Sequence, residues 1–188
     1  MSFHDLRQFL SRLSEQGQLI ELDAPISPEL ESTALSLRAL RAQGPALWLH
    51  NPTGSSHSLL CNLFGHRRRI ELALGNRPLA SLRELGELLA ALKEPRWPSN
   101  LRDALGSWPE LAQLAHVAPR REVDAPFCEE VIEGPDIDLT RLPIQRCRPE
   151  DIDRLITFGL VITRGTRQER QNVAIYRQQV IGRNRVIM

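Results

Sequence analysis

Lysine is almost absent from this sequence, because 23 of its 24 basic residues are arginines and Lys93 is the other one. Cysteine is also scarce: Cys61, Cys128 and Cys147 are far apart and odd in number, which excludes a disulfide framework and a CxxC metal site. No apolar run approaches the roughly 18 residues of a membrane span, and the first residues lack the regions of a signal peptide. Together these absences predict a protein of the reducing cytoplasm.

The composition is otherwise that of a soluble globular protein, with 41% hydrophobic and 25% charged residues in a chain of 188. The net charge of +1 hides an asymmetry. Residues 1–140 carry 14 basic and 19 acidic side chains, whereas residues 141–188 carry 10 arginines and 4 acids. Guanidinium groups suit phosphate and carboxylate recognition, so the arginine-rich last quarter is the more informative part.

The first 116 residues predict alternating helices and strands, which is typical of an α/β domain. Hydrophobic residues recur at helical spacing between Phe3 and Leu13, with Ser2 as the candidate N-cap. Ser27 and Pro28 predict the start of a second helix, because serine favours the N-cap and proline the first helical position. The other expected elements are strands at 18–22, 46–50 and 58–62 and helices at 67–74, 80–92 and 101–116.

Prolines and charges without periodicity place a linker at residues 117–126. The following residues, 127–188, predict strands at 127–133, 155–164, 171–181 and 185–188, with a tight turn at 182–184. The expected fold class is therefore α+β: an N-terminal α/β domain over residues 1–116, followed by a mostly β half.

The most informative stretch is polar where a strand is expected, and reads QERQNVAIYRQQ at residues 168–179. Each unpaired buried polar group costs about 1–3 kcal/mol, so the stretch is either a solvated edge strand or the lining of a polar site. Arg177 suits a phosphate or carboxylate, and the Asn172 carbonyl oxygen suits a hard metal ion. In a flat strand these two side chains face opposite sides, so a shared site needs a bulge, a bend or a ligand that wraps the strand end.

Two other features have plain structural interpretations. The run HRRR at residues 66–69 has no aromatic stacking platform beside it, so we interpret it as a solvated helix face and predict no nucleic-acid partner. Cys147 is flanked by arginines but has no histidine nearby, which favours an inert thiol.

A family resemblance extends from the polar stretch, which continues as ERQNVAIYRQQVIGRNRVIM. This stretch resembles the UbiD family of decarboxylases, and closely its 3-octaprenyl-4-hydroxybenzoate carboxy-lyase branch. Further matching stretches are DLRQFLSRLSEQGQL, GPALWLHNPTG, CNLFG, LRELGELLAALKEP, CRPED and LITFGLVITRG. The resemblance implies that residues 127–188 hold the first strands of a split β-barrel-like flavin-binding domain.

The resemblance also implies a chemistry. The family uses prenylated FMN with a divalent metal, usually manganese, and often potassium. It reversibly decarboxylates aromatic or α,β-unsaturated acids, in this branch a 4-hydroxybenzoate-type acid of ubiquinone biosynthesis. The expected partners are that small-molecule acid and further copies of the chain in a homo-oligomer. A prenylated substrate would allow peripheral association with the inner face of the cell membrane.

Residue by residue, Asn172 matches the asparagine that ligates the metal bridging the cofactor phosphate. Ile175, Tyr176 and Arg177 match the segment that contacts prenylated FMN. Arg177 also matches the catalytic arginine that orients the substrate carboxylate together with two acids.

The sequence is shorter than the members of the family. The metal-binding glutamate and the catalytic acids, which lie further along in the family, have no counterpart here. Arg148 and Phe158 stand where the close branch has tryptophans, and Ala174 stands where it has glycine. We therefore expect a fragment, a truncated gene product or a divergent paralogue that is inactive by itself. The alternative is a module that binds or interacts without catalysis.

Overall fold

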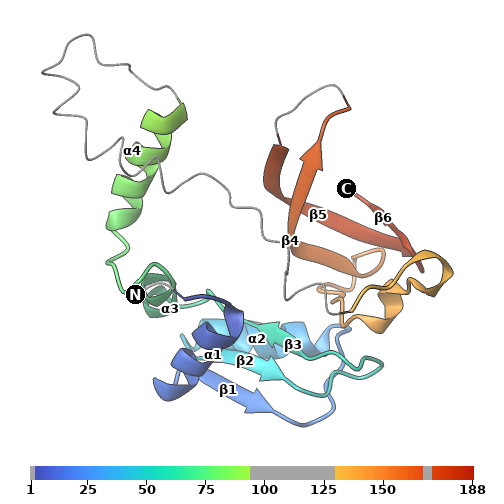
Figure 1. Ribbon diagram of the computed structural model, residues 1–188. Coiled ribbons are helices and arrows are strands. Elements are labelled where there is room, and N and C mark those ends of the chain that lie inside the picture. The colour runs from blue at the N-terminus through green and yellow to red at the C-terminus, as the bar shows by residue number, and fades with distance from the viewer. Residues whose placement is uncertain (1–2, 94–129, 167–170) are drawn as a thin grey trace, which may run out of the picture. The chain divides into compact units, whose positions relative to one another are not determined.

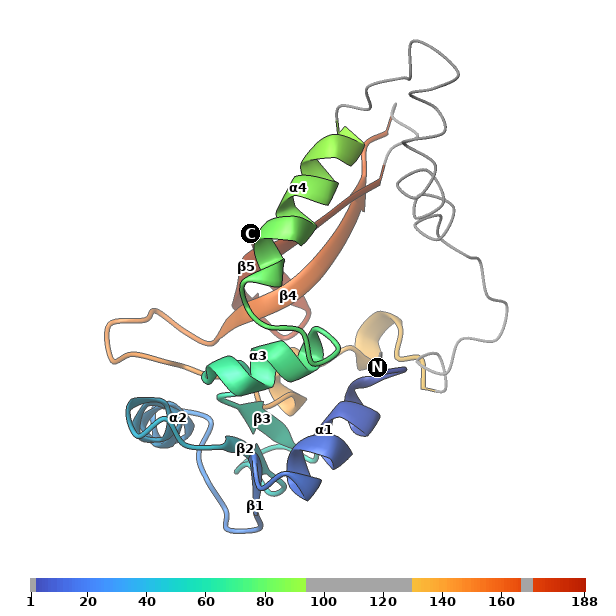
Figure 2. The ribbon, with the colours of Figure 1, turned by 90° about the vertical axis from the view of Figure 1, so that its left-hand side faces the viewer.

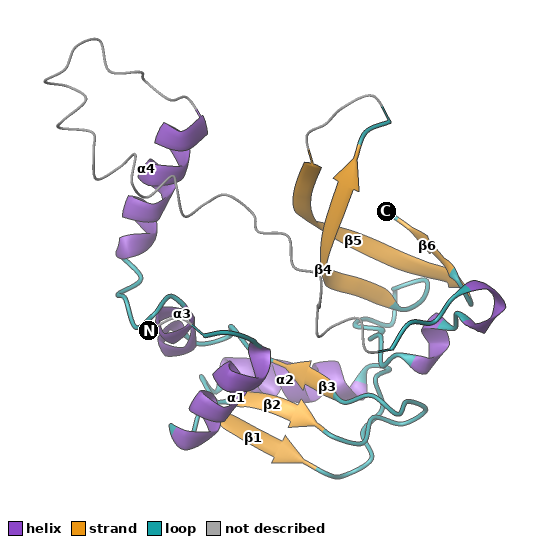
Figure 3. Ribbon diagram, in the orientation of Figure 1, coloured by secondary structure: helices purple, strands orange, loops and turns teal. Residues whose placement is uncertain are grey.

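The computed structural model describes residues 3–93, 130–166 and 171–188 of the chain. The chain forms two compact units: the first unit is Met1–Asn76 with Ile132–Met188, and the second unit is Arg77–Val131. The first unit contains two three-stranded sheets (Figures 1 and 3). The predicted linker at 117–126 and the predicted helix at 101–116 lie outside the described residues, so the domain boundary stays a prediction.

The N-terminal sheet has the order β1-β2-β3, formed by Leu19–Leu22, Ala46–Leu49 and Leu59–Cys61. β1 and β2 are parallel, and β2 and β3 are antiparallel. Parallel neighbours need a crossover connection, which α2 (Glu31–Arg41) supplies between β1 and β2. The strands expected at 18–22, 46–50 and 58–62 and the helix expected at 67–74 form close to where the patterns placed them.

Helices cover both faces of this sheet, as Figure 2 shows for α1 (Leu6–Glu15) and α2. α1 and α3 (Arg67–Ala73) contribute to a cluster on one face, composed of Phe9, Leu10, Leu13, Leu19, Ala46 and Leu72. α2 packs Leu35 and Ala39 against the other cluster, composed of Ile26, Leu47, Leu49 and Cys61. Alternate residues of β2 enter opposite clusters, as the two-residue period of a strand requires.

The two helix starts differ from the sequence prediction. Asp5, rather than Ser2, caps α1, because its carboxylate accepts a hydrogen bond from the Gln8 N–H at 2.8 Å. α2 begins at Glu31 rather than near Pro28. The reason is a long-range contact: Leu30 adopts a φ of 64°, and its N–H donates to the Arg146 carbonyl at 2.9 Å.

The second sheet is antiparallel, with the order β4-β5-β6 formed by Leu155–Arg164, Gln171–Gly182 and Arg185–Ile187. Short 3-10 helices at Gly134–Asp136 and Leu139–Arg141 precede it. The strand predicted at 127–133 is wrong for its described part, since residues 130–133 form no strand. The α+β class, with an α/β part followed by antiparallel strands, is confirmed. The second unit contributes α4 (Ser81–Lys93) to the described residues.

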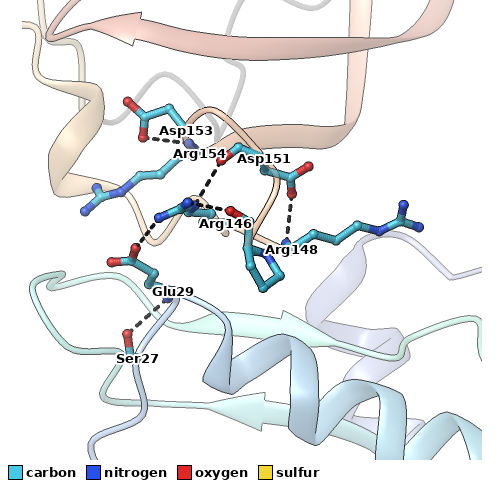
Figure 4. Close-up of polar contacts among 8 residues, drawn as sticks. Ser27, Glu29, Arg146, Arg148, Asp151, Asp153 and Arg154 are labelled. Atoms are coloured by element: carbon cyan, nitrogen blue, oxygen red, sulfur yellow. Dashed lines mark hydrogen bonds and ion pairs between the residues drawn. The ribbon is translucent and has the colours of Figure 1, made fainter.

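A connector, residues 142–154, ties the N-terminal sheet to β4. The Arg146 guanidinium donates to the Glu29 carboxylate at 2.9 Å and to the carbonyls of Pro149 and Asp151 (Figure 4). The Asp151 carboxylate in turn accepts from the Arg148 N–H at 2.9 Å. The CRPED stretch that carried part of the resemblance is therefore a turn folded around the side chain of Arg146.

Arg69 corrects the interpretation of the basic run as a solvated face. Arg67 and Arg68 are exposed, but Arg69 is completely buried. Its guanidinium donates to the carbonyls of Leu63, Asn62 and Gly44 at 2.8–2.9 Å, and to the Gln18 side chain at 3.3 Å. Burial lowers the pKa of this guanidinium from its ordinary value. Arg69 therefore holds the turn after β3 against the end of α2 and the start of β1.

Replacing Arg69 tests this role. Arg69→Ala should lower the free energy of unfolding by about 3 kcal/mol, because several partly buried acceptors lose their donor at once. The exposed Arg68→Ala is the matched control and should change it by no more than about 0.5 kcal/mol. Urea denaturation followed by circular dichroism measures both, and equal losses in the two variants would contradict the assignment.

Candidate functional site

The residues singled out from the sequence lie on β5, the central strand of the second sheet. Asn172 and Tyr176 are four residues apart and therefore share one face of the strand. Ile175 and Arg177 share the opposite face. The register confirms that both faces belong to a regular ladder, since Asn172 pairs with Thr163 and Ile175 pairs with Leu160.

A hydrogen bond joins the two polar residues of the first face. The Asn172 amide Nδ2 donates to the Tyr176 phenol oxygen at 3.2 Å, with both side chains exposed. This bond uses the nitrogen of the amide and leaves its carbonyl oxygen, Oδ1, without a hydrogen-bond partner among the described residues. Asn172 thus exposes an amide oxygen of the kind that coordinates hard metal ions, and the hydrogen bond to Tyr176 orients its side chain.

The opposite face is apolar and ends at an arginine. Phe158, Leu160 and Ile162 of β4 are 64–69% exposed, and Val173 and Ile175 of β5 lie beside the last two of them through the strand register. Apolar surface of this extent is typical of a ligand or protein contact. We refer to these five residues as the apolar face.

Arg177 has an exposed guanidinium next to the apolar face, at the position where β4 is irregular. The register slips between Ile156 and Gly159, so β4 carries one extra residue opposite Arg177. Such a bulge bends the strand and increases its twist. Within the described residues the Arg177 side chain has no hydrogen-bond or ion-pair partner. Other arginines of this quarter are engaged, for example Arg146 with Glu29 and Arg183 with Asp138.

The structure keeps the two predicted groups apart. The sequence required a bulge or bend for Asn172 and Arg177 to share a site, and the bulge that forms is on β4 rather than between these residues on β5. Asn172 with Tyr176 and Ile175 with Arg177 are therefore two pairs on opposite faces. A ligand that contacts all four must reach around the strand.

The described residues fit a flavin better than a metal. An apolar face with an adjacent guanidinium offers what an aromatic ring bearing an anionic group needs. A divalent cation needs several oxygen ligands, and Asn172 supplies one. Among the described residues there is no group of three or more His, Cys, Asp or Glu side chains that could hold a metal. Asn172 by itself therefore supplies too few oxygen atoms to hold a divalent cation.

Comparison with known families decides the membership of the chain. Residues 10–89 match the 3-octaprenyl-4-hydroxybenzoate carboxy-lyase N-terminal domain, and residues 120–188 match the Rift-related domain of the same enzymes. The chain belongs to the UbiD family. GPALWLHNPTG and CNLFG fall within the first match, and CRPED, LITFGLVITRG and the stretch that ends at Met188 fall within the second. DLRQFLSRLSEQGQL and LRELGELLAALKEP overlap the first match in part.

Solved structures give the same result. The UbiD-class enzyme HmfF from Pelotomaculum thermopropionicum in complex with FMN is 26% identical, with a TM-score of 0.73, and the match covers 97% of this chain and 36% of that one. An evolved dimeric form of HmfF in complex with prFMN gives 26% identity and a TM-score of 0.74, over 98% of this chain and 37% of that one.

The vanillic acid decarboxylase of Sedimentibacter hydroxybenzoicus, in its open form, is 27% identical, with a TM-score of 0.73. That match covers 99% of this chain and 36% of the other. The chain therefore spans little more than a third of the length of these UbiD-class structures. No helix among the described residues of this chain has the length and apolarity needed to cross a bilayer.

Sequence reasoning missed the irregular part of β4 that faces Arg177. A bulge depends on how two strands pair, and neither strand alone carries that information. Gly159, just after the extra residue, was the available signal, because an isolated glycine in a strand pattern often marks a bulge.

The contact between Asn172 and Tyr176 can be tested directly. Tyr176→Phe removes the oxygen that accepts the Asn172 amide, so the side-chain NH2 signals of Asn172 should move in an NMR spectrum of the labelled chain. Since both side chains are exposed, the free energy of unfolding should change by no more than about 0.5 kcal/mol. Unmoved Asn172 signals would show that the two side chains do not meet in solution.

Proposed function

We propose that this chain is the flavin-binding portion of a UbiD-type carboxy-lyase, which releases CO2 from an aromatic or α,β-unsaturated acid. The observation that carries the proposal is Arg177: an unpartnered guanidinium beside the apolar face, within a match to the Rift-related domain. HmfF, which shares this fold, was solved with FMN and with prFMN, and this supports a flavin as the ligand.

In the proposed site, Arg177 holds the substrate carboxylate by paired hydrogen bonds and fixes its orientation. Ile175, Tyr176 and Arg177 contact the cofactor, and the apolar face excludes water from its ring. Prenylated FMN, when bound, would supply an electron sink for the electron pair that stays on the substrate when CO2 leaves. Asn172 would contribute one oxygen to a divalent metal, proposed as Mn2+. K+ is the proposed additional cation.

The remaining parts of the proposal concern partners and place. The proposed substrate is a 4-hydroxybenzoate-type acid of ubiquinone biosynthesis, and the proposed assembly is a homo-oligomer, as in the dimeric form of HmfF. The proposed location is the cytoplasm, with peripheral attachment to the membrane through a prenylated substrate. No nucleic acid takes part.

Flavin binding tests the role of Arg177. FMN fluorescence should be quenched when the full 188-residue chain is titrated into it. Arg177→Ala should weaken the affinity by about tenfold to a hundredfold, since a charge-assisted hydrogen bond contributes about 1.5–3 kcal/mol. Arg185→Ala, an exposed arginine on β6, is the matched control and should bind as the parent does. Equal weakening by both variants would indicate nonspecific charge, and no quenching would overturn the proposal of a flavin site in this chain.

Turnover is a separate question from binding. With prenylated FMN and Mn2+ supplied, we expect no release of CO2 by the 188-residue chain above the background of free cofactor. Asn172 alone cannot fix a metal, and protonation by a positioned acid contributes about 10²–10⁴-fold to such reactions. CO2 is measured with and without a longer chain of the family as control. Flavin binding without turnover is the expected result, and turnover above the background would show that the 188-residue chain suffices for the reaction.

A further inference from the structure

Two of the three cysteines lie in the region where the connector packs against the N-terminal sheet. Cys61 ends β3 and is buried, while Cys147 in the connector is partly exposed. Gln145 contacts Cys61: its side-chain Nε2 donates to the Ser32 hydroxyl at 2.9 Å and approaches the Cys61 sulfur to 3.7 Å. The connector therefore reaches Cys61 with a residue only two positions before Cys147.

The backbone geometry turns Cys147 to the same side as Gln145. Arg146 forms a parallel β-bridge with Glu29, and its carbonyl accepts from the Leu30 N–H at 2.9 Å, so the backbone is extended here. In extended backbone, residues two apart point to the same side. Gln145 contacts Cys61, and Cys147 is the next side chain directed toward the N-terminal sheet.

Cys147 also influences the ionisation of Cys61. Burial raises the pKa of Cys61 to about 11, and the proximity of Cys147 contributes to this rise, against the opposing effect of the Gln145 hydrogen bond. This contribution agrees with the backbone geometry, which places Cys147 on the same side of the connector as Gln145.

We propose that Cys61 and Cys147 form an intramolecular disulfide when the chain is exposed to a peroxide. The bond would link β3 directly to the connector and close a loop that contains the whole second unit. It would make the contact between the N-terminal sheet and the strand of the candidate site covalent. This site of modification is independent of flavin binding and of the proposed reaction.

The chemistry assigns each cysteine a step. The more accessible Cys147 thiolate attacks a peroxide oxygen, the O–O bond breaks, and a sulfenic acid forms with release of hydroxide. The Cys61 thiolate then attacks the sulfenyl sulfur, the S–O bond breaks, and a second hydroxide leaves. The two hydroxides take up the two thiol protons as water. The thiols lose two electrons in total and hydrogen peroxide gains them.

The resolving step should have an unusual pH dependence. Only the thiolate attacks, and the fraction of Cys61 present as thiolate keeps rising until the pH reaches about 11. An ordinary thiol with a pKa near ~8.5 has mostly ionised by pH 9. Disulfide formation should therefore still become several-fold faster between pH 9 and pH 10, where a pair of ordinary thiols would show little change.

The experiment uses the full 188-residue chain carrying Cys128→Ser, which leaves Cys61 and Cys147 as the two thiols. The reduced protein is treated with hydrogen peroxide and digested without reductant. Mass spectrometry should find the peptides of Cys61 and Cys147 linked, in protein that stays monomeric on a non-reducing gel. Both thiols should be lost together, and the melting temperature should rise by several degrees and return when the bond is reduced.

Cys147→Ser in the same background is the matched control. Its Cys61 should stay reduced under the same peroxide treatment, because it is buried and has no sulfenic acid to attack, and its melting temperature should not respond to peroxide. Cys61→Ala should instead leave Cys147 as a sulfenic acid that a dimedone probe captures. Oxidation of the parent to sulfinic acids without a linked peptide, or links between chains only, would overturn the proposal.

Discussion

The two sheets of the first unit are joined through the backbone of Gln145 and Arg146. The Arg146 carbonyl accepts from Leu30 at 2.9 Å, and the Gln145 carbonyl accepts from Leu155, the first residue of β4, at the same distance. Leu155 begins β4, and the pairing of β4 with β5 carries this starting position to β5. These two main-chain hydrogen bonds of the connector therefore help to place Arg177 and Asn172 relative to the N-terminal sheet.

Local patterns were sufficient where an element depends on its own residues. The two long strands and the tight turn before β6 follow from alternation and from Gly182–Asn184, and the structure reproduces them. The start of α2 was wrong because Ser27 and Pro28 give a strong local signal, while Leu30 is engaged by Arg146 more than a hundred residues away. A contact of that kind leaves no trace in the sequence around Leu30.

The candidate site shows the same division. The residue types on β5 and the separation of Asn172 from Arg177 by strand parity could be deduced from the sequence, and the register agrees. The bulge opposite Arg177 could not, since it depends on how β4 and β5 pair. The bond from Asn172 to Tyr176 could not either, since it depends on the side-chain conformations of the two residues. The roles of these residues toward a cofactor rest on resemblance, because a binding role needs the ligand as well as the strand.

Arg69 has a consequence for how the N-terminal part responds to its surroundings. All four of its acceptors are uncharged oxygens, from three main-chain carbonyls and one amide. None of these acceptors is a carboxylate that acid could protonate. Nor are these hydrogen bonds an exposed ion pair that salt could screen, as the pair of Arg67 with Glu71 is. The hydrogen bonds by which Arg69 holds the turn after β3 should therefore weaken neither in acid nor at high ionic strength.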